Sequence, residues 1–273
     1  MSVMVSHNPS SRRETEPSRQ SRRFPVPVTF FRESGIIGLA AYLYFFVRGM
    51  IHAREADAME HARWLVSTEK SLGIFHEQQF QSLILGHDWL VTLVNSIYIY
   101  GHWPVVVGTL TWLFIKHRPV FPVFRTAMVL SGVVGFVFFF LFPMAPPRFL
   151  GDLGFVDTIT LHSEAYRVLQ PPSLTNQFAA MPSLHVGWNL LMGIAIVRYS
   201  SHWGWKVFGV MMPLAMWIAT IFTANHYFVD GIVGSALVLG GLAVAWKLSG
   251  PKDPVWIERR VSPERSTQHP IAA

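Results

Sequence analysis

The fold class is decided by residues 207–246, which read VFGVMMPLAMWIATIFTANHYFVDGIVGSALVLGGLAVAW and contain one charged residue, Asp230. A helix needs about 20 predominantly apolar residues to cross the hydrocarbon core of a bilayer. This stretch is long enough for two crossings, with the polar sequence TANH at 223–226 between them. It therefore predicts two antiparallel membrane helices that meet at a polar turn.

The rest of the chain is similarly apolar. Of its 273 residues, 51% are hydrophobic and 14% are charged, whereas soluble domains carry about 25% charged residues. Because Pro104 lies within the apolar segment at 88–116, we expect that segment to kink or to project beyond the bilayer. The fold class that we predict is an all-α integral membrane bundle of six transmembrane helices. We place them at about 31–52, 88–116, 121–142, 183–199, 206–223 and 228–248.

Basic residues set the expected topology. Residues 1–29 are rich in Arg, Ser and Pro, which predicts a disordered basic tail, and residues 250–273 form a second tail. With both tails in the cytoplasm, 16 of the 22 Lys and Arg residues lie inside the cell, as the positive-inside rule requires. The membrane catalytic domain, 30–249, then extends loops 53–87 and 143–182 outside the cell membrane. The first loop has apolar residues at helical spacing, and we expect it to lie on the membrane surface.

Composition also excludes several classes of function. The chain has no cysteine, which rules out disulfides, iron–sulfur clusters and a cysteine nucleophile. Its net charge of +6 is accounted for by the cytoplasmic segments of a membrane protein, so we expect no nucleic-acid partner. The expected surroundings are membrane lipids.

Three polar clusters stand at the outer ends of predicted helices, FPMAPPRFL at 142–150, AAMPSLHVG at 179–187 and TANHYFVDGIVG at 223–234. In the third, His226 and Asp230 are four residues apart and therefore share one helix face. A carboxylate in that position can hold one imidazole nitrogen and leave the other free to attack. The alternative is a buried pair that satisfies its own hydrogen bonds.

The other two clusters suit an anion. Pro182 is interpreted as the first position of a helix, which places the Ser183 hydroxyl and unpaired backbone N–H groups at a positive helix end. His185 is near enough to donate a proton to that anion. Arg148 follows two prolines, and its planar guanidinium suits bidentate phosphate binding. The alternatives are a helix-capping serine, an interfacial histidine and an arginine that extends to the membrane surface.

A polar stripe crosses the second predicted helix. Asn95, Tyr98 and His102 recur at helical spacing in an otherwise apolar sequence. Such side chains either hydrogen-bond between helices or line the pocket for a head group or an acceptor.

In this order, the clusters resemble those of the type 2 phosphatidic acid phosphatase superfamily, especially its inositol phosphorylceramide synthase-like branch. That family has a Pro-Ser-Gly-His motif and a motif ending His-x-x-x-Asp; this chain has PSLH at 182–185 and HYFVD at 226–230. The resemblance implies that His226 is the nucleophile of a phosphohistidine enzyme, Asp230 orients it, and His185 protonates the leaving alcohol. Ser183 and Arg148 would hold phosphate oxygens. No metal or other cofactor is implied.

The departures from the family pattern concern positive charge. Leu141 stands at the position of a motif lysine, and Thr220 at that of an arginine. Arg148 is thus one of three expected cations. A phosphomonoester dianion needs more positive charge than a diester monoanion, so the deficit favours transfer of a phospho-head group from a phospholipid, unless Arg167 supplies the missing charge. Asn225, beside the nucleophile, can also donate to phosphate.

We therefore expect a lipid phosphotransferase that acts at the outer leaflet on a phospholipid and an alcohol or polyol acceptor. The first alternative is a simple phosphatase of phosphatidic acid or polyprenyl phosphate. A membrane metalloenzyme with His185, His226 and Asp230 as ligands is less consistent with the sequence, because membrane desaturases and hydroxylases have a pattern with many more paired histidines. A transporter is less consistent with polar groups gathered at one membrane face.

Overall fold

The computed structural model describes residues 54–162 and 176–249, together with a few positions between 30 and 42. Most of the first predicted membrane helix, both tails and Arg167 lie outside these residues. Within the described part every regular element is a helix, and the β-contact present is an isolated bridge between Met144 and Ala179. The all-α prediction is confirmed for these residues. The helices named below belong to one compact unit, which begins at Tyr42.

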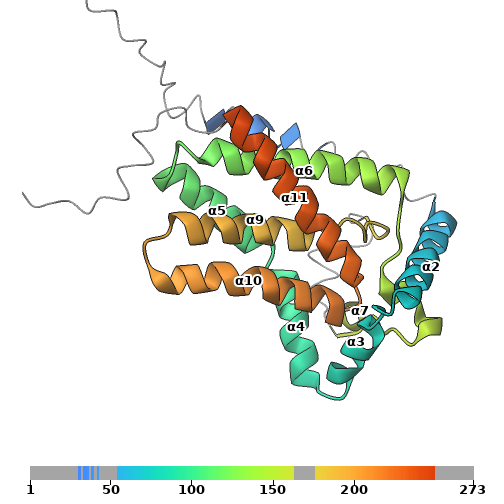
Figure 1. The fold of residues 1–273 in the computed structure, drawn as a ribbon. Coiled ribbons are helices and arrows are strands. Elements are labelled where there is room, and N and C mark those ends of the chain that lie inside the picture. The colour runs from blue at the N-terminus through green and yellow to red at the C-terminus, as the bar shows by residue number, and fades with distance from the viewer. Residues whose placement is uncertain are drawn as a thin grey trace, which may run out of the picture. The chain divides into compact units, whose positions relative to one another are not determined.

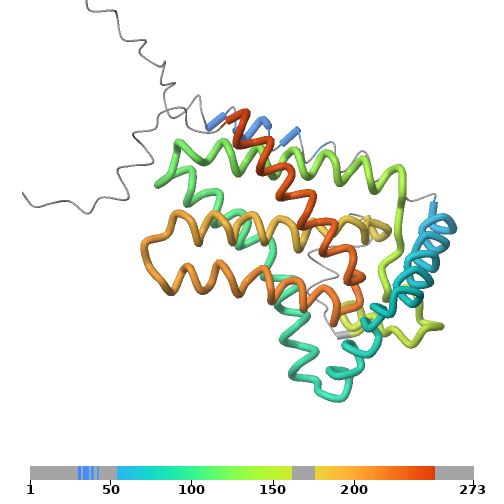
Figure 2. The backbone as a smooth tube through the Cα atoms, viewed as in Figure 1, coloured from blue at the N-terminus to red at the C-terminus, as the bar shows by residue number. Residues whose placement is uncertain are grey.

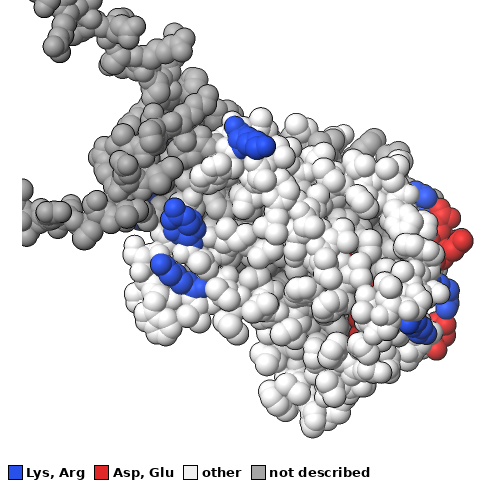
Figure 3. Space-filling view, viewed as in Figure 1, with Lys and Arg blue, Asp and Glu red and all other residues white. Residues whose placement is uncertain are grey.

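Within the described residues, four stretches are long and apolar enough to cross a membrane. They are Asp88–Lys116, Phe121–Leu141 (α6), Trp203–Phe222 (α10) and Phe228–Ser249 (α11). Charged side chains gather at the two ends of the face in Figure 3 and leave its middle uncharged. These stretches coincide with four of the predicted crossings. The crossing predicted at 183–199 is the shorter helix α9, Leu184–Tyr199, which is 16 residues long and mostly buried among its neighbours (Figure 1).

The stretch Asp88–Lys116 is divided into α4 (Asp88–Tyr100) and α5 (Trp103–Lys116). The break lies at Gly101 and His102, just before Pro104. Pro104 occupies the second position of α5, where a missing N–H breaks no intrahelical hydrogen bond. The kink expected from this proline is therefore a break between two helices, and it leaves the side chain of His102 buried.

Glycines set the spacing of the central helices. A Cβ atom added to Gly187 on α9 would lie 2.6 Å from the carbonyl oxygen of Gly234 on α11, and one added to Gly209 on α10 would lie 3.0 Å from the carbonyl oxygen of Gly193 on α9. In a bilayer there is little hydrophobic drive for helices to associate, so close backbone approach at small residues stabilises the contact. Helix α9 is thereby held close to both α10 and α11.

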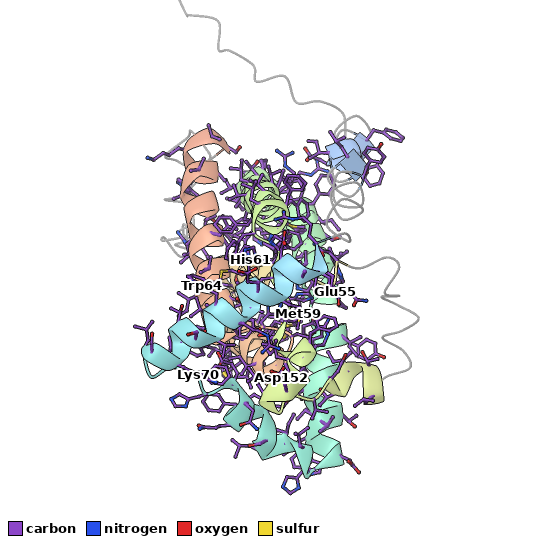
Figure 4. The ribbon with its side chains drawn as sticks, turned by 90° about the vertical axis from the view of Figure 1, so that its right-hand side faces the viewer. Glu55, Met59, His61, Trp64, Lys70 and Asp152 are labelled. Atoms are coloured by element: carbon purple, nitrogen blue, oxygen red, sulfur yellow. The ribbon has the colours of Figure 1, made fainter. Side chains whose placement is uncertain are left out.

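Two further helices, α2 (Glu55–Ser71) and α3 (Glu77–Leu85), cover one end of the bundle. Figure 4 looks onto α2, which crosses that end, with Trp64 and Lys70 along its length. Its apolar face packs against the loop that follows α6. The buried residues of this contact include Ala58, Ala62, Leu65, Val66, Met144, Ala145, Leu150 and Phe155. The helical prediction for the first loop is thus confirmed.

The loop after α6 contains two short 3₁₀ helices, η1 (Pro147–Phe149) and η2 (Gly151–Leu153), and the short helix α7 (Thr158–His162). An exposed ion pair between Arg63 of α2 and Asp152, with Nη1 and Oδ2 at 2.8 Å, ties this loop to the covering helix. The backbone N–H of Ala145 also donates to the carbonyl oxygen of Ala58 at 3.0 Å. These contacts fix the segment that carries Arg148.

Candidate active site

The polar clusters meet at the end of the bundle that α2 covers. Figure 2 shows the start of α9 and the turn between α10 and α11 near the same end. The backbone N–H of Arg148 donates to the carbonyl oxygen of Ala224 at 2.9 Å, which joins the first cluster to the third. The N–H of Ser183 donates to the carbonyl oxygen of Asp230 at 3.0 Å, which joins the second to the third. Residues far apart in the sequence therefore form one site.

The imidazole of His226 is held through one ring nitrogen. Its Nδ1 lies 2.7 Å from the carbonyl oxygen of Ala180 and 3.3 Å from Oδ2 of Asp230. A carbonyl oxygen can only accept a hydrogen bond, so Nδ1 carries the proton and Nε2 carries the lone pair. Oδ2 of Asp230 also accepts from the backbone N–H of Tyr227 at 2.9 Å. The ring is thus fixed in the form whose Nε2 is nucleophilic.

His226 is nearly inaccessible to solvent, with 4% of its surface exposed. Burial and, to a smaller extent, the charge of Arg148 lower the pKa of His226, and the hydrogen bond to Ala180 opposes them; the net pKa is about 4. A buried imidazole avoids the cost of desolvating its charged form by staying neutral. The nucleophilic form therefore exists at physiological pH.

Ser183 and His185 stand at the start of α9. Ser183 is the N-cap residue, and its hydroxyl accepts from the N–H of Val186 at 3.4 Å. The helix begins at Leu184, so the prediction that Pro182 is the first helical position is wrong, because the capping hydroxyl sets the start after Ser183. The ring centroids of His185 and His226 are 5.9 Å apart. The helix end and both histidines are therefore within one small site.

Arg148 is held from both sides. Its Nη1 donates to Oδ1 of Asn225, and its Nε lies 3.6 Å from Oδ2 of Asp157. The guanidinium carbon is 4.9 Å from the ring centroid of Phe149, and 12% of the side chain is exposed. Asn225 is further fixed by donating to the Thr223 hydroxyl at 2.8 Å. The structure thus brings Arg148 and Asn225 together beside His226.

The polar stripe on the second predicted helix divides into two parts. Asn95 exchanges side-chain hydrogen bonds with Thr158, donating to its carbonyl at 3.0 Å and accepting from its hydroxyl at 3.1 Å. Tyr98 and His102 instead pack against His185, with ring centroids 4.8 and 4.4 Å from it. Asn95 therefore holds the loop that follows α6, whereas Tyr98 and His102 are in contact with a candidate catalytic ring.

The family model described as "PAP2 superfamily" matches residues 63–244, about two thirds of the chain. The chain belongs to the PAP2 superfamily. The phosphoinositol dihydroceramide synthase of Bacteroides thetaiotaomicron is 27% identical over 172 residues, which are 57% of this chain and 56% of that protein. The match thus spans little more than half of the relative. No solved structure matches the chain. The family resemblance predicted from the motifs is confirmed.

In this PAP2 superfamily chain, the two positions expected to carry further cations cannot do so. Thr220 is fully buried, its hydroxyl donates to the carbonyl of Trp217 at 2.7 Å, and its own carbonyl accepts from the N–H groups of Asn225 and His226. Leu141 lies at the end of α6 and is 65% exposed. Among the described residues, Arg148 is therefore the basic side chain whose contacts place it in the site.

Several residues around the PAP2 site were not foreseen from sequence. Asn189 donates both to Nδ1 of His102 at 2.9 Å and to the carbonyl oxygen of His185 at 2.8 Å, and so connects α9 to the break before α5. Asp157 pairs with Arg148 as described. Glu69 on α2 and Glu77 on α3 are buried, and Glu77 accepts a hydrogen bond from the N–H of Phe228 at the start of α11. Asn189 could have been predicted from the sequence, because it is four residues after His185 on the same helix. The positions of Asp157, Glu69 and Glu77 depend on tertiary contacts.

Within residues 54–162 and 176–249, no group of three or more His, Asp or Glu side chains is arranged to hold a metal ion. The two histidines and the carboxylate proposed as metal ligands from the sequence have other contacts instead. Nδ1 of His226 is occupied by Ala180, and the rings of His185 and His102 pack against each other.

Proposed function

We propose that this chain is a metal-independent lipid phosphotransferase that works through a phosphohistidine on His226. The observation that carries the proposal is the hydrogen bonding of Nδ1, which leaves the Nε2 lone pair of a neutral, buried imidazole for attack on phosphorus. Asp230 orients the ring and stabilises the positive charge that develops on it. No cofactor is required by this chemistry.

The reaction has two balanced steps. In the first, Nε2 of His226 forms a bond to phosphorus as the bond to the leaving alkoxide breaks, and His185 gives a proton to that alkoxide. In the second, an acceptor hydroxyl gives its proton to His185 and attacks the phosphohistidine, which releases His226. Ser183, Arg148 and Asn225 would bind the phosphoryl oxygens at the amino end of α9.

The charge of the site favours a phosphodiester donor. Arg148 is already near Asp157, with Nε and Oδ2 at 3.6 Å, so part of its charge is balanced before substrate binds. A diester carries one negative charge, and a monoester at neutral pH carries nearly two. We therefore favour transfer of a phospho-head group over hydrolysis of phosphatidic acid or polyprenyl phosphate, which remains the alternative. Arg167 would add charge if its loop approaches the site.

Tyr98 and His102 are the side chains that we assign to the acceptor pocket. Both contact His185, the group that exchanges protons with leaving and attacking hydroxyls. Asn189 donates to Nδ1 of His102, so the proton of His102 is on Nε2 and is available to a lipid or polyol oxygen. Asn95 acts indirectly, by holding α7.

We also propose the membrane arrangement inferred from the basic residues: six transmembrane helices, both termini in the cytoplasm and the site at the outer leaflet of the cell membrane. The apolar stretches and the uncharged middle of the bundle support a membrane location. In this arrangement, α2 and α3 lie on the outer membrane surface above the site. The tails would flank a single catalytic domain at 30–249.

The deciding experiment is a transfer assay with purified protein and a panel of head-group-labelled phosphodiester and phosphomonoester lipids. The name of the Bacteroides relative leads us to include a phosphoinositol lipid as donor and a dihydroceramide as acceptor. We expect new labelled phosphodiester and little free phosphate. Release of phosphate from monoesters, with no product from any acceptor, would instead establish a lipid phosphatase. Failure of every lipid phosphate to react would reject both.

A further inference from the structure

Two carboxyl side chains are buried where the outer helices meet the start of α11. Glu69, near the end of α2, has 0% of its surface exposed, and Glu77, at the start of α3, has 1% exposed. Neither has an ion pair with a basic residue among the described residues. Carboxylates are almost never fully buried without a partner. Acidic residues on surface helices usually face solvent, so the burial of this pair indicates a specific role.

Glu77 acts as an acceptor through both oxygens. Its Oε1 accepts from the backbone N–H of Phe228 at 2.8 Å, and its Oε2 accepts from the N–H of His76 at 3.0 Å. Phe228 is the first residue of α11, whose first N–H groups have no partner within the helix. An ionised Glu77 therefore caps α11 from a neighbouring helix, two residues before Asp230. The negative charge is also favourable at the positive end of the helix dipole.

Glu69 has the opposite character. Both of its carboxyl oxygens are buried, and neither has a hydrogen-bond partner of normal geometry. Burial, together with the negative charges of Glu77 and Asp230, raises the pKa of Glu69 to about 9. Glu69 therefore holds a proton at neutral pH. The neighbouring charge that acts on it most strongly is that of Glu77, so the two buried groups differ in role: Glu69 is protonated, and Glu77 accepts hydrogen bonds from the backbone.

The titratable groups near Glu69 belong to three neighbouring segments of the chain. Glu77 belongs to α3, Asp230 to α11, and Tyr227 to the turn before α11; burial raises the pKa of Tyr227, which keeps that phenol neutral. Lys70, next along α2, is directed at the Phe75 ring, 5.1 Å from its centroid. Arg63 of α2, whose charge acts on Tyr227, is exposed and paired with Asp152. Loss of the Glu69 proton would thus add a negative charge beside those of Glu77 and Asp230, and neither Lys70 nor Arg63 forms an ion pair with it.

We propose that Glu69 and Glu77 form a pair of buried carboxyl groups that positions the amino end of α11, and with it Asp230 and His226, and that loss of the proton on Glu69 loosens this arrangement. Both glutamates are positioning residues, since neither contacts the reacting atoms. The effect on catalysis rests on the proposed transferase function. The protonation of the pair does not, and it can be measured separately.

The test compares Glu69→Gln, Glu77→Gln and the control Glu60→Gln, which changes an exposed glutamate on the same helix. Glutamine mimics protonated glutamate. We expect wild-type and Glu60→Gln transfer rates to fall as pH rises through about 9, and Glu69→Gln to keep its neutral-pH rate and lose that fall. Glu77→Gln removes the negative charge and replaces one of the two acceptor oxygens by an NH₂ group, so it should lower kcat about tenfold with little change in KM, the scale of a weakened helix cap. An alkaline fall that is identical in wild type and Glu69→Gln would overturn the proposal.

Infrared spectroscopy in deuterated buffer gives a readout that needs no substrate. We expect a protonated-carboxyl band in the wild type at neutral pH that titrates near pH 9 and is absent from Glu69→Gln. The same band in Glu69→Gln and in wild type would reject the pair, whatever the activity. A band that behaves as expected, in a protein that turns over no lipid phosphate, would support the pair and reject the proposed function instead.

Discussion

Replacing Gly234 with alanine tests how closely the two catalytic helices must approach. Gly234 is one turn after Asp230 on α11 and faces the start of α9. A Cβ atom there would overlap the carbonyl oxygen of Ser183, and it would lie 2.9 Å from the carbonyl carbon and 3.1 Å from the nitrogen of the same residue. These are backbone atoms, so no rotamer change can relieve the contact. Ser183 must move relative to α11.

The expected displacement is about 1 Å, which is enough to cost about 100-fold in rate when it separates catalytic groups. It would move His185 and the start of α9, where we propose that phosphate binds, away from His226. Packing strain of this kind also costs about 1–3 kcal/mol of stability. We therefore expect kcat to fall by about two orders of magnitude in a protein that still folds.

The matched control is Gly240→Ala on the same helix, where an added Cβ meets no atom within 4 Å. The assay is kcat for head-group transfer in detergent micelles, with thermal unfolding measured in parallel. Gly240→Ala should retain wild-type kcat and should not lose stability. A Gly234→Ala enzyme with wild-type kcat would refute the reasoning, because the α9–α11 contact would then not set the catalytic geometry.

Three further outcomes are expected. His226→Ala should abolish both turnover and phosphoenzyme, and His185→Ala should slow turnover by about 10²–10⁴-fold through loss of proton donation; labelled phosphoenzyme on a gel distinguishes them, and an active His226→Ala would end the mechanism. Because burial lowers the pKa of His226 to about 4, its neutral form persists into acid, so kcat/KM should decline only as pH falls toward 4; a decline centred near 6.5, the ordinary histidine value, would contradict this. In intact cells an impermeant thiol reagent should label Gly151→Cys and not Ser201→Cys, both at exposed positions; the opposite pattern would place the site in the cytoplasm.

The membrane helices could be predicted because each is encoded by one long, continuous apolar stretch of sequence. Uncharged runs of about 20 residues have few other stable states, so α6, α10 and α11 lie close to their predicted positions. The His226–Asp230 contact was also predictable, because the two residues are only four apart in the sequence. The prediction that both lie on one helix face is wrong, because α11 begins at Phe228 and His226 lies in the bend before it. The break between α4 and α5 was placed only roughly, since Pro104 fits the first turn of a new helix as well as a kink.

The supporting residues were not predictable for a different reason. Glu69 lies among charged residues on α2 and Glu77 among glutamines on α3, and in such polar sequences an acidic side chain is normally exposed. Their burial depends on how α2 and α3 pack over α11, which no local pattern records. The same holds for Asn95. Its helical spacing with Tyr98 and His102 could be seen in the sequence, but its hydrogen bonds to Thr158 depend on how the loop after α6 packs against α4.

The hydrogen bonding of His226 also determines which phosphohistidine can form. Imidazole can be phosphorylated at either nitrogen, which gives two positional isomers with different stabilities. With Nδ1 facing the carbonyl oxygen of Ala180 at 2.7 Å, a phosphoryl group can be added only at the nitrogen remote from the main chain, which yields the τ isomer. This isomer is the longer-lived of the two in water, so the intermediate of the proposed mechanism would persist while a lipid acceptor diffuses in the plane of the membrane.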